Sequence, residues 1–138
     1  MDGTPAAGRA VAWAAREARR RNATVLAAHV LTYDAELARD LPPNGLTNWR
    51  ATLRSHLEGK WVEPLIRAGV AFEVVFVETD TVDGGLLRLA AERSVQLIVL
   101  GAHGRGDLKD RLLGGVTYKV SHRADRPVVI IPADWDAP

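Results

Sequence analysis

Apolar positions along the chain alternate between helical spacing and short continuous runs, a pattern that predicts helices and buried strands in turn. Small apolar residues recur at helical spacing after Thr4, a suitable N-cap, and continue until about Arg21, where Asn22 is the expected stop. Residues 24–31 are almost all apolar, as expected for a strand covered on both faces. Residues 34–45 contain two prolines and a glycine and predict a long loop.

The middle of the chain predicts an interrupted helix followed by a strand and another helix. Apolar residues step at helical spacing through Leu46, Trp49, Leu53, Leu57 and Trp61. Pro64 lacks a backbone donor, so we expect it to interrupt this helix near Gly59. Valine and phenylalanine mark a strand at 70–77, and Asp80 is the expected N-cap of the next helix.

The C-terminal part predicts a short buried strand at 96–100, a helix from about Gly114 to Ala124 and a last strand at 127–132. Strands that alternate with helices indicate an α/β fold with a parallel sheet. Right-handed crossovers would place helices on both faces of that sheet.

Composition narrows the class of protein. The 138 residues are 47% apolar and 25% charged, as in one ordinary soluble domain, here 1–138. The absence of cysteine excludes disulfides and thiol nucleophiles and is consistent with a reducing cytoplasm. Eighteen basic residues nearly balance seventeen acidic ones, and no basic region precedes an apolar run. We therefore expect a cytoplasmic domain that binds neither nucleic acid nor membrane.

The segment after the strand at 96–100 carries the clearest chemical signal. Gly101 and Gly104 follow directly, where an open parallel sheet binds its ligands. Gly114 and Gly115 then open a helix, whose first N–H groups form a site for an anion such as phosphate. From spacing alone, glycines that only shape a turn fit equally well.

Other site classes are disfavoured by the sequence. Residues 101–106 do not follow the dinucleotide-binding pattern, and no P-loop pattern occurs. The histidines His29, His56, His103 and His122 have no metal-ligand spacing. His103 lies inside the glycine loop, where it either contacts phosphate or is an exposed loop residue. No serine lies in a nucleophile-elbow context, so a hydrolase triad is disfavoured.

The full glycine spacing resembles the signature G-2x-G-9x-G-(S/T) of the universal stress protein family, through Gly101, Gly104 and Gly114. Residues 1–5 are similar to the turn after the family's first strand, and His29-Val30 and 127–131 to two of its strand segments. The resemblance implies a doubly wound open parallel sheet of Rossmann-like type with strand order 3-2-1-4-5. It also implies a fold that is often dimeric and, in many members, ATP at the glycine loop.

The resemblance further implies roles for single residues. Asp2 would face the ribose–phosphate side of the nucleotide, and Val30 would meet the adenine through its backbone. Gly115 departs from the signature, which has Ser or Thr there, and the lost hydroxyl would weaken binding about ten- to a hundredfold. With His103 added, the candidate nucleotide-binding residues are Asp2, Thr4, Pro5, Val30, Gly101, His103, Gly104, Gly114, Gly115, Val116 and Thr117.

We interpret the chain as a stress-linked sensor that binds ATP, or AMP or ADP, with or without Mg²⁺. No residue stands out as a general base or nucleophile, so we expect no dedicated catalysis, although slow ATP hydrolysis stays open. The alternative is a nucleotide-free dimerisation module in which Gly115 marks a lost site. A third interpretation, a phosphate-ester enzyme, would need a metal held by Asp2 with Asp107 or Asp110.

Two expectations concern the strands of the sheet. In strand order 3-2-1-4-5 the strand at 128–131 is an edge, and we expect a homodimer through it and Pro132. The family's first strand is central and ends just before the Asp-Gly turn, whereas here nothing precedes Met1 in the printed sequence. We therefore expect a domain shortened before that strand, a natural start upstream of Met1, and a gap or a borrowed strand between 24–31 and 96–100.

Overall fold

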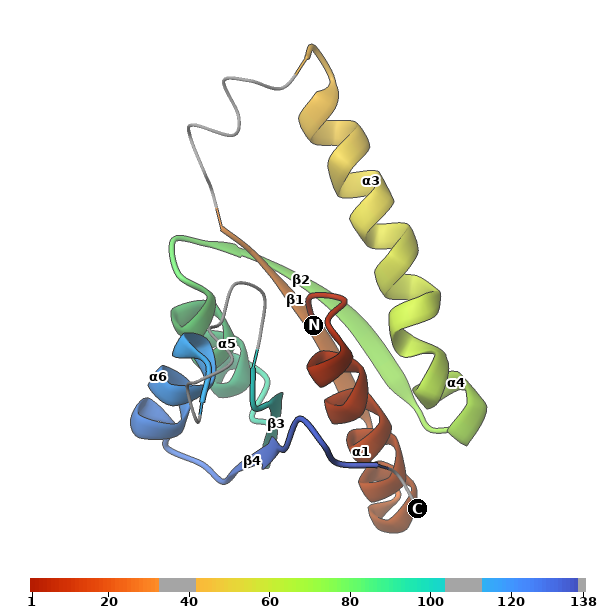
Figure 1. Cartoon of the computed structure of the whole chain (residues 1–138), viewed down its shortest axis with the longest axis vertical. Helices are drawn as coiled ribbons and strands as arrows, with labels where there is room; N and C mark the ends of the chain where they lie inside the picture. Colours follow the sequence, from red (N-terminus) through yellow and green to blue (C-terminus); the bar gives the residue numbers. More distant parts are fainter. Residues whose placement is uncertain (33–41, 104–112, 137–138) are drawn as a thin grey trace.

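The computed structural model describes residues 1–32, 42–103 and 113–136 of the chain. Helices and strands alternate, as predicted (Figure 1). Their order is α1 (Pro5–Arg21), β1 (Val25–Thr32), α3 (Gly45–Glu58), the 3₁₀ helix η1 (Lys60–Val62), α4 (Glu63–Ala68), β2 (Phe72–Thr79), α5 (Val82–Glu92), β3 (Ile98–Gly101), α6 (Gly115–Arg123) and β4 (Val128–Ile131).

The strands form two parallel pairs rather than one continuous sheet. β1 pairs with β2 from Val25↔Phe72 onward, and β3 pairs with β4 from Ile98↔Val128 onward. In the family's strand order 3-2-1-4-5, β1 and β2 correspond to strands 2 and 3, and β3 and β4 correspond to strands 4 and 5. Within the described residues no pairing joins β1 to β3, which is the gap expected between them.

Helix α1 contacts strands of both pairs and also α4. Its N-cap is Thr4, whose Oγ1 accepts a hydrogen bond from Ala7 N over 3.2 Å, and it ends at Asn22 in the left-handed conformation, both as predicted. The buried face consists of Ala6, Ala10, Val11, Ala15 and Ala18. Such small side chains let the helix lie close to the strands, so α1 connects the two sheets (Figure 1).

The β1–β2 pair has the larger apolar core. Ala27 of β1 packs with Val11 and Ala15 of α1 and with the fully buried Val62 and Leu65. The predicted interruption of the middle helix is present, because α3 ends at Glu58 and α4 begins at Glu63. The strand β2 starts later than residue 70 because Val70 N–H still donates to Leu65 O at the end of α4.

The β3–β4 pair packs against α5 and α6 around Ala90, Ile98 and the fully buried Val120. Asp80 is not the N-cap of α5, which corrects the sequence prediction. Thr81 takes that place because its backbone is extended and its Oγ1 accepts a hydrogen bond from Gly84 N over 3.2 Å.

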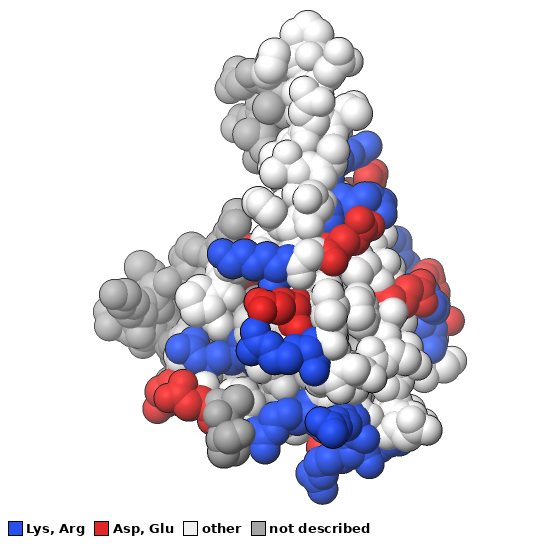
Figure 2. All heavy atoms as spheres, turned by 90° about the vertical axis from the view of Figure 1, so that its right-hand side faces the viewer, with Lys and Arg blue, Asp and Glu red and all other residues white. Residues whose placement is uncertain are grey.

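Helix α3 lies largely outside this body. Its Gly45 end projects from the rest of the molecule, as the view in Figure 2 also shows. Polar contacts anchor it to β2: Arg50 pairs with Glu78 at 3.0 Å, and the Arg54 guanidinium lies 4.6 Å from the centre of the Phe76 ring. Trp49 on α3 remains 38% exposed.

Candidate functional site

A tight turn at residues 2–4 starts the site. Asp2 Oδ1 accepts hydrogen bonds from Thr4 N at 3.0 Å and from Thr4 Oγ1 at 2.7 Å. Between them Gly3 has a φ of +80°, a left-handed conformation that glycine adopts without steric cost. Thr4 caps α1, and Pro5 is its first residue. The turn therefore holds the Asp2 carboxylate at the N-terminus of α1.

The same turn is tied to β1. The Met1 amino group donates to Ala28 O, and His29 Nδ1 contacts Met1 O. Burial lowers the pKa of the Met1 amino group, and the neighbouring Asp2 carboxylate offsets this only in part. These contacts place Asp2 beside the carboxyl-terminal half of β1.

Val30 lies in that half of β1 with its backbone on the edge away from β2. Val25 N–H donates to Ala71 O at 2.9 Å, and backbone groups alternate in direction along a strand. The N–H and C=O of Val30 therefore point away from β2, as the proposed adenine contact requires. Its side chain faces α5, where a Cβ added at Gly85 would come within 3.0 Å of Val30 Cγ1.

Gly101, at the end of β3, lies against the start of α1. A Cβ at this position would come within 2.6 Å of Ala6 O. The sequence left two reasons for this glycine open, the approach of a ligand and the shaping of a turn. The structure adds a reason that needs no ligand, since the first turn of α1 already occupies the space that a side chain would take.

The first turn of α6 also contacts the end of β3. Gly114 N donates to Ala102 O at 2.7 Å, and Thr117 Oγ1 donates to Gly101 O at 2.8 Å. Thr117 is buried and Val116 is 36% exposed. A Cβ on Gly115 would meet no atom within 4 Å. The first turn of α6 is thus fixed beside the end of β3, and a helix N-terminus favours an anion there.

The structure thus assembles most of the predicted residues around the end of β3 and the start of α1. They are Asp2, Thr4, Pro5, Gly101, Gly114, Gly115, Val116 and Thr117, whereas Val30 lies on β1 with its side chain against α5. The Nδ1 atom of His103 is buried and has no hydrogen-bond partner among the described residues. Gly104 lies outside the described residues, as do Asp107 and Asp110.

Trp61, in η1, is a residue of the site that sequence reasoning missed. A Cβ at Gly3 would come within 2.6 Å of Trp61 Cζ2, so the turn lies directly on the indole ring. The helical spacing from Leu57 to Trp61 indicated only an apolar helix face. No local signal in the sequence links Trp61 to the turn before the N-terminus of α1.

Two further features of the described residues concern metal ions and membranes. In 1–32, 42–103 and 113–136, no group of three or more His, Cys, Asp or Glu residues is placed to hold a metal ion. Among the helices of these ranges, none is long and apolar enough to cross a membrane.

Comparison with known proteins gives the family. A model of the universal stress protein family matches residues 1–132. The chain belongs to the universal stress protein family. A universal stress protein of Mycolicibacterium smegmatis is 33% identical over 138 residues, which cover 95% of this chain and 43% of the relative. The chain thus spans less than half the length of that curated relative.

Solved universal stress proteins have the same fold. One, solved in complex with cAMP, has a TM-score of 0.70 and 24% identity and covers 97% of this chain and 93% of its own. Another, from Archaeoglobus fulgidus in complex with dAMP, has a TM-score of 0.68 and 21% identity and covers 95% and 91%. The α/β fold of the universal stress proteins is therefore the fold of this chain.

Proposed function

We propose that this universal stress protein binds an adenine nucleotide at the junction of β1, β3, α1 and α6. The carrying observation is the position of Gly101, which touches the first turn of α1 at Ala6 and accepts a hydrogen bond from Thr117 in the first turn of α6. Two helix N-termini thus converge beside the end of one strand. The solved universal stress proteins in complex with cAMP and dAMP support this ligand class.

Each part of the site matches one part of a nucleotide. The N-terminus of α6, which begins at Gly115, favours the phosphate charge. The Asp2 carboxylate is an acceptor for ribose hydroxyls. The backbone N–H and C=O of Val30 offer a donor and an acceptor to the adenine edge.

The finer proposal is a cytoplasmic sensor that binds ATP and forms a homodimer. Its action is regulation through the bound nucleotide, with no dedicated catalysis. The predicted dimer interface is the outer edge of β4 with Pro132.

Direct identification of the ligand tests the central proposal. Nucleotide released from the purified, denatured protein is identified by mass spectrometry, and ATP, AMP and cAMP are titrated calorimetrically. Adenine nucleotide at near one molecule per chain is the expected result. A protein that carries none and binds none of the three supports the nucleotide-free dimerisation module instead.

Gly115 provides a gain-of-function test. Gly115→Ser restores the hydroxyl of the family signature and should tighten binding about ten- to a hundredfold. Gly115→Ala is the matched control, because a Cβ at this position meets nothing within 4 Å and adds no hydroxyl. Equal affinities of the two variants would show that the hydroxyl contributes nothing to binding.

Substitutions in β4 test the proposed homodimer separately. Ile98 N–H donates to Pro127 O and Ala102 N–H to Ile131 O, so alternation directs the N–H of Ile130 away from β3. Ile130→Pro removes that outer donor and should yield monomers in light scattering, whereas Ile130→Ala keeps it and should not. A wild-type monomer at micromolar concentrations would contradict the dimer.

A further inference from the structure

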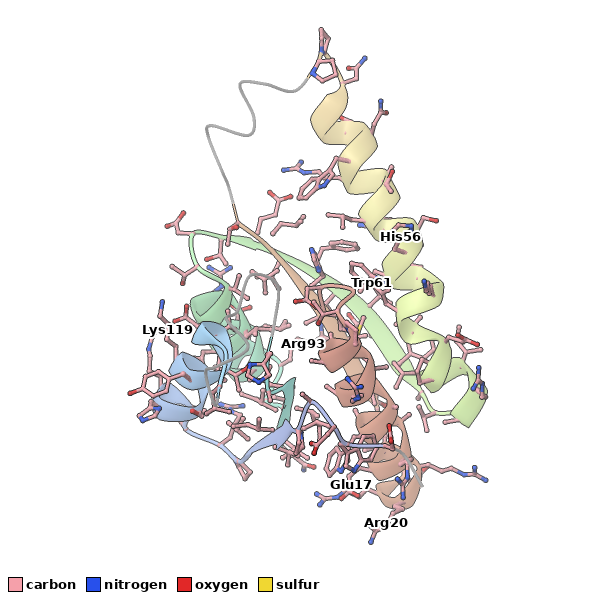
Figure 3. All side chains as sticks on the ribbon, viewed as in Figure 1. Glu17, Arg20, His56, Trp61, Arg93 and Lys119 are labelled. Carbon is pink, nitrogen blue, oxygen red and sulfur yellow. The ribbon has the colours of Figure 1, made fainter. Side chains whose placement is uncertain are left out.

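The indole ring of Trp61 lies against the backbone of the turn that carries Asp2 and Thr4. A Cβ built on Gly3 would come within 2.6 Å of Trp61 Cζ2 and 2.8 Å of Cε2. Gly3 also has a φ of +80°. Glycine is thus needed here for two separate reasons, the left-handed backbone and the contact with the ring. Figure 3 shows Trp61 beside the N-terminal turn.

Trp61 is itself held in place from several elements. Its ring centre lies 5.6 Å from that of His29 on β1 and 6.0 Å from that of His56 on α3. The neighbouring Leu57 and Val62 are fully buried. Trp61 is half-buried, and its contacts with these two rings and with Gly3 restrict its rotation. The ring therefore forms one wall of the space around the turn.

We infer that Trp61 is a positioning residue for the nucleotide site, and this inference rests on the proposed function. The ring limits the conformations open to Gly3 and so keeps Asp2 and Thr4 in the arrangement that their hydrogen bonds define. If the turn sampled other conformations, the apparent affinity for the nucleotide would fall in proportion to the fraction of molecules in the binding-competent conformation. Removing the ring should therefore weaken nucleotide binding without removing any atom that touches the nucleotide.

The first experiment compares tryptophan variants of the full chain in calorimetric titrations with ATP and AMP. Trp61→Ala should weaken binding about tenfold, and Trp61→Phe should recover part of that loss because it keeps an aromatic wall. Trp49→Ala on the projecting part of α3 is the control and should bind like the wild type. Circular dichroism checks that each variant is folded at the titration temperature.

A double-mutant cycle then tests the contact itself. Gly3→Ala should weaken binding through both the ring contact and the left-handed backbone. In the Trp61→Ala background the ring contact is gone, so the same substitution should cost several-fold less affinity. Equal losses in both backgrounds would show that ring and turn act independently, which overturns the inference.

A spectroscopic readout separates positioning from a purely structural role. With Trp13, Trp49 and Trp135 replaced by Phe, the emission of Trp61 should shift on addition of ATP, since the turn on its ring contacts the nucleotide. If the wild-type protein binds ATP but the emission of Trp61 does not shift, this inference alone is overturned. The same holds if Trp61→Ala binds with wild-type affinity. Absence of binding by the wild-type protein overturns the proposed function and the inference with it.

Discussion

Each strand of the β1–β2 pair has eight residues, whereas each strand of the β3–β4 pair has four. The long pair packs against a core that includes the fully buried Val62 and Leu65. Around the short pair, polar contacts are prominent: Arg123 Nη1 donates to buried Asp83 at 2.5 Å, and Arg126 Nη1 donates to Ala90 O at 2.6 Å.

The two strand pairs are therefore stabilised in different ways. The long pair derives its order from apolar side chains, whose burial contributes free energy in proportion to area. The short pair has a smaller apolar core around Val120, to which it adds the close backbone approach at Gly101 and hydrogen bonds from Thr117 and Gly114. We expect core substitutions to act mainly on folding, and substitutions at the end of β3 to act on both folding and binding.

The largest effect should come from the core of the long pair. Leu65→Ala removes a fully buried side chain and should lower the free energy of unfolding by about 2–5 kcal/mol. Ile66→Ala is the matched control on the same helix, because Ile66 is 55% exposed and should change stability by less than about 0.5 kcal/mol. Urea denaturation measures both, and equal losses would contradict the assigned core.

Gly101→Ala tests whether the short pair depends on backbone approach. The new Cβ would come within 2.6 Å of Ala6 O, and such overpacking costs about 1–3 kcal/mol of unfolding free energy. In Gly8→Ala the Cβ meets nothing within 4 Å, so this control should stabilise α1 by about 0.5–1 kcal/mol. A Gly101→Ala protein as stable as the wild type would show that α1 and β3 do not need this contact.

The two threonine N-caps sharpen the distinction between folding and binding. Thr4→Ala and Thr81→Ala each remove a cap hydrogen bond of 3.2 Å and should cost about 0.5–2 kcal/mol of stability. Only Thr4 also bonds Asp2, so only Thr4→Ala should weaken ATP binding. Thermal unfolding and calorimetric titration measure the two effects. A comparable loss of affinity in Thr81→Ala would contradict the location of the site.

The smallest effect concerns an exposed ion pair between β2 and the end of α5. The hydrogen bond from Arg93 lowers the pKa of Glu73, which therefore stabilises the fold when ionised. This contribution is present above the unfolded-state pKa and is lost as pH falls through the lowered folded-state pKa. The melting-temperature difference between the wild type and Glu73→Gln should shrink on acidification and at high salt. A difference independent of both would exclude the ion pair as its cause.

Elements of the fold were predictable from local patterns. Asn22 ends α1 in the left-handed conformation that asparagine tolerates, and the interruption before Pro64 follows from proline's missing donor. The cap of α5 was predicted wrongly at Asp80, since neighbouring residues both have capping side chains and only the path of the chain selects Thr81. The gap between the strand pairs followed from the family's strand order rather than from a local pattern.

By itself, the sequence determined the order of helices and strands and the glycine spacing after β3, because helix caps and apolar periodicity act over a few residues. The tertiary structure alone decided which atoms those residues meet. Gly101 faces Ala6 and Gly3 faces Trp61, although each pair is far apart along the chain. Such contacts depend on how α1, η1 and β3 pack, and packing sums many weak interactions that no short segment encodes.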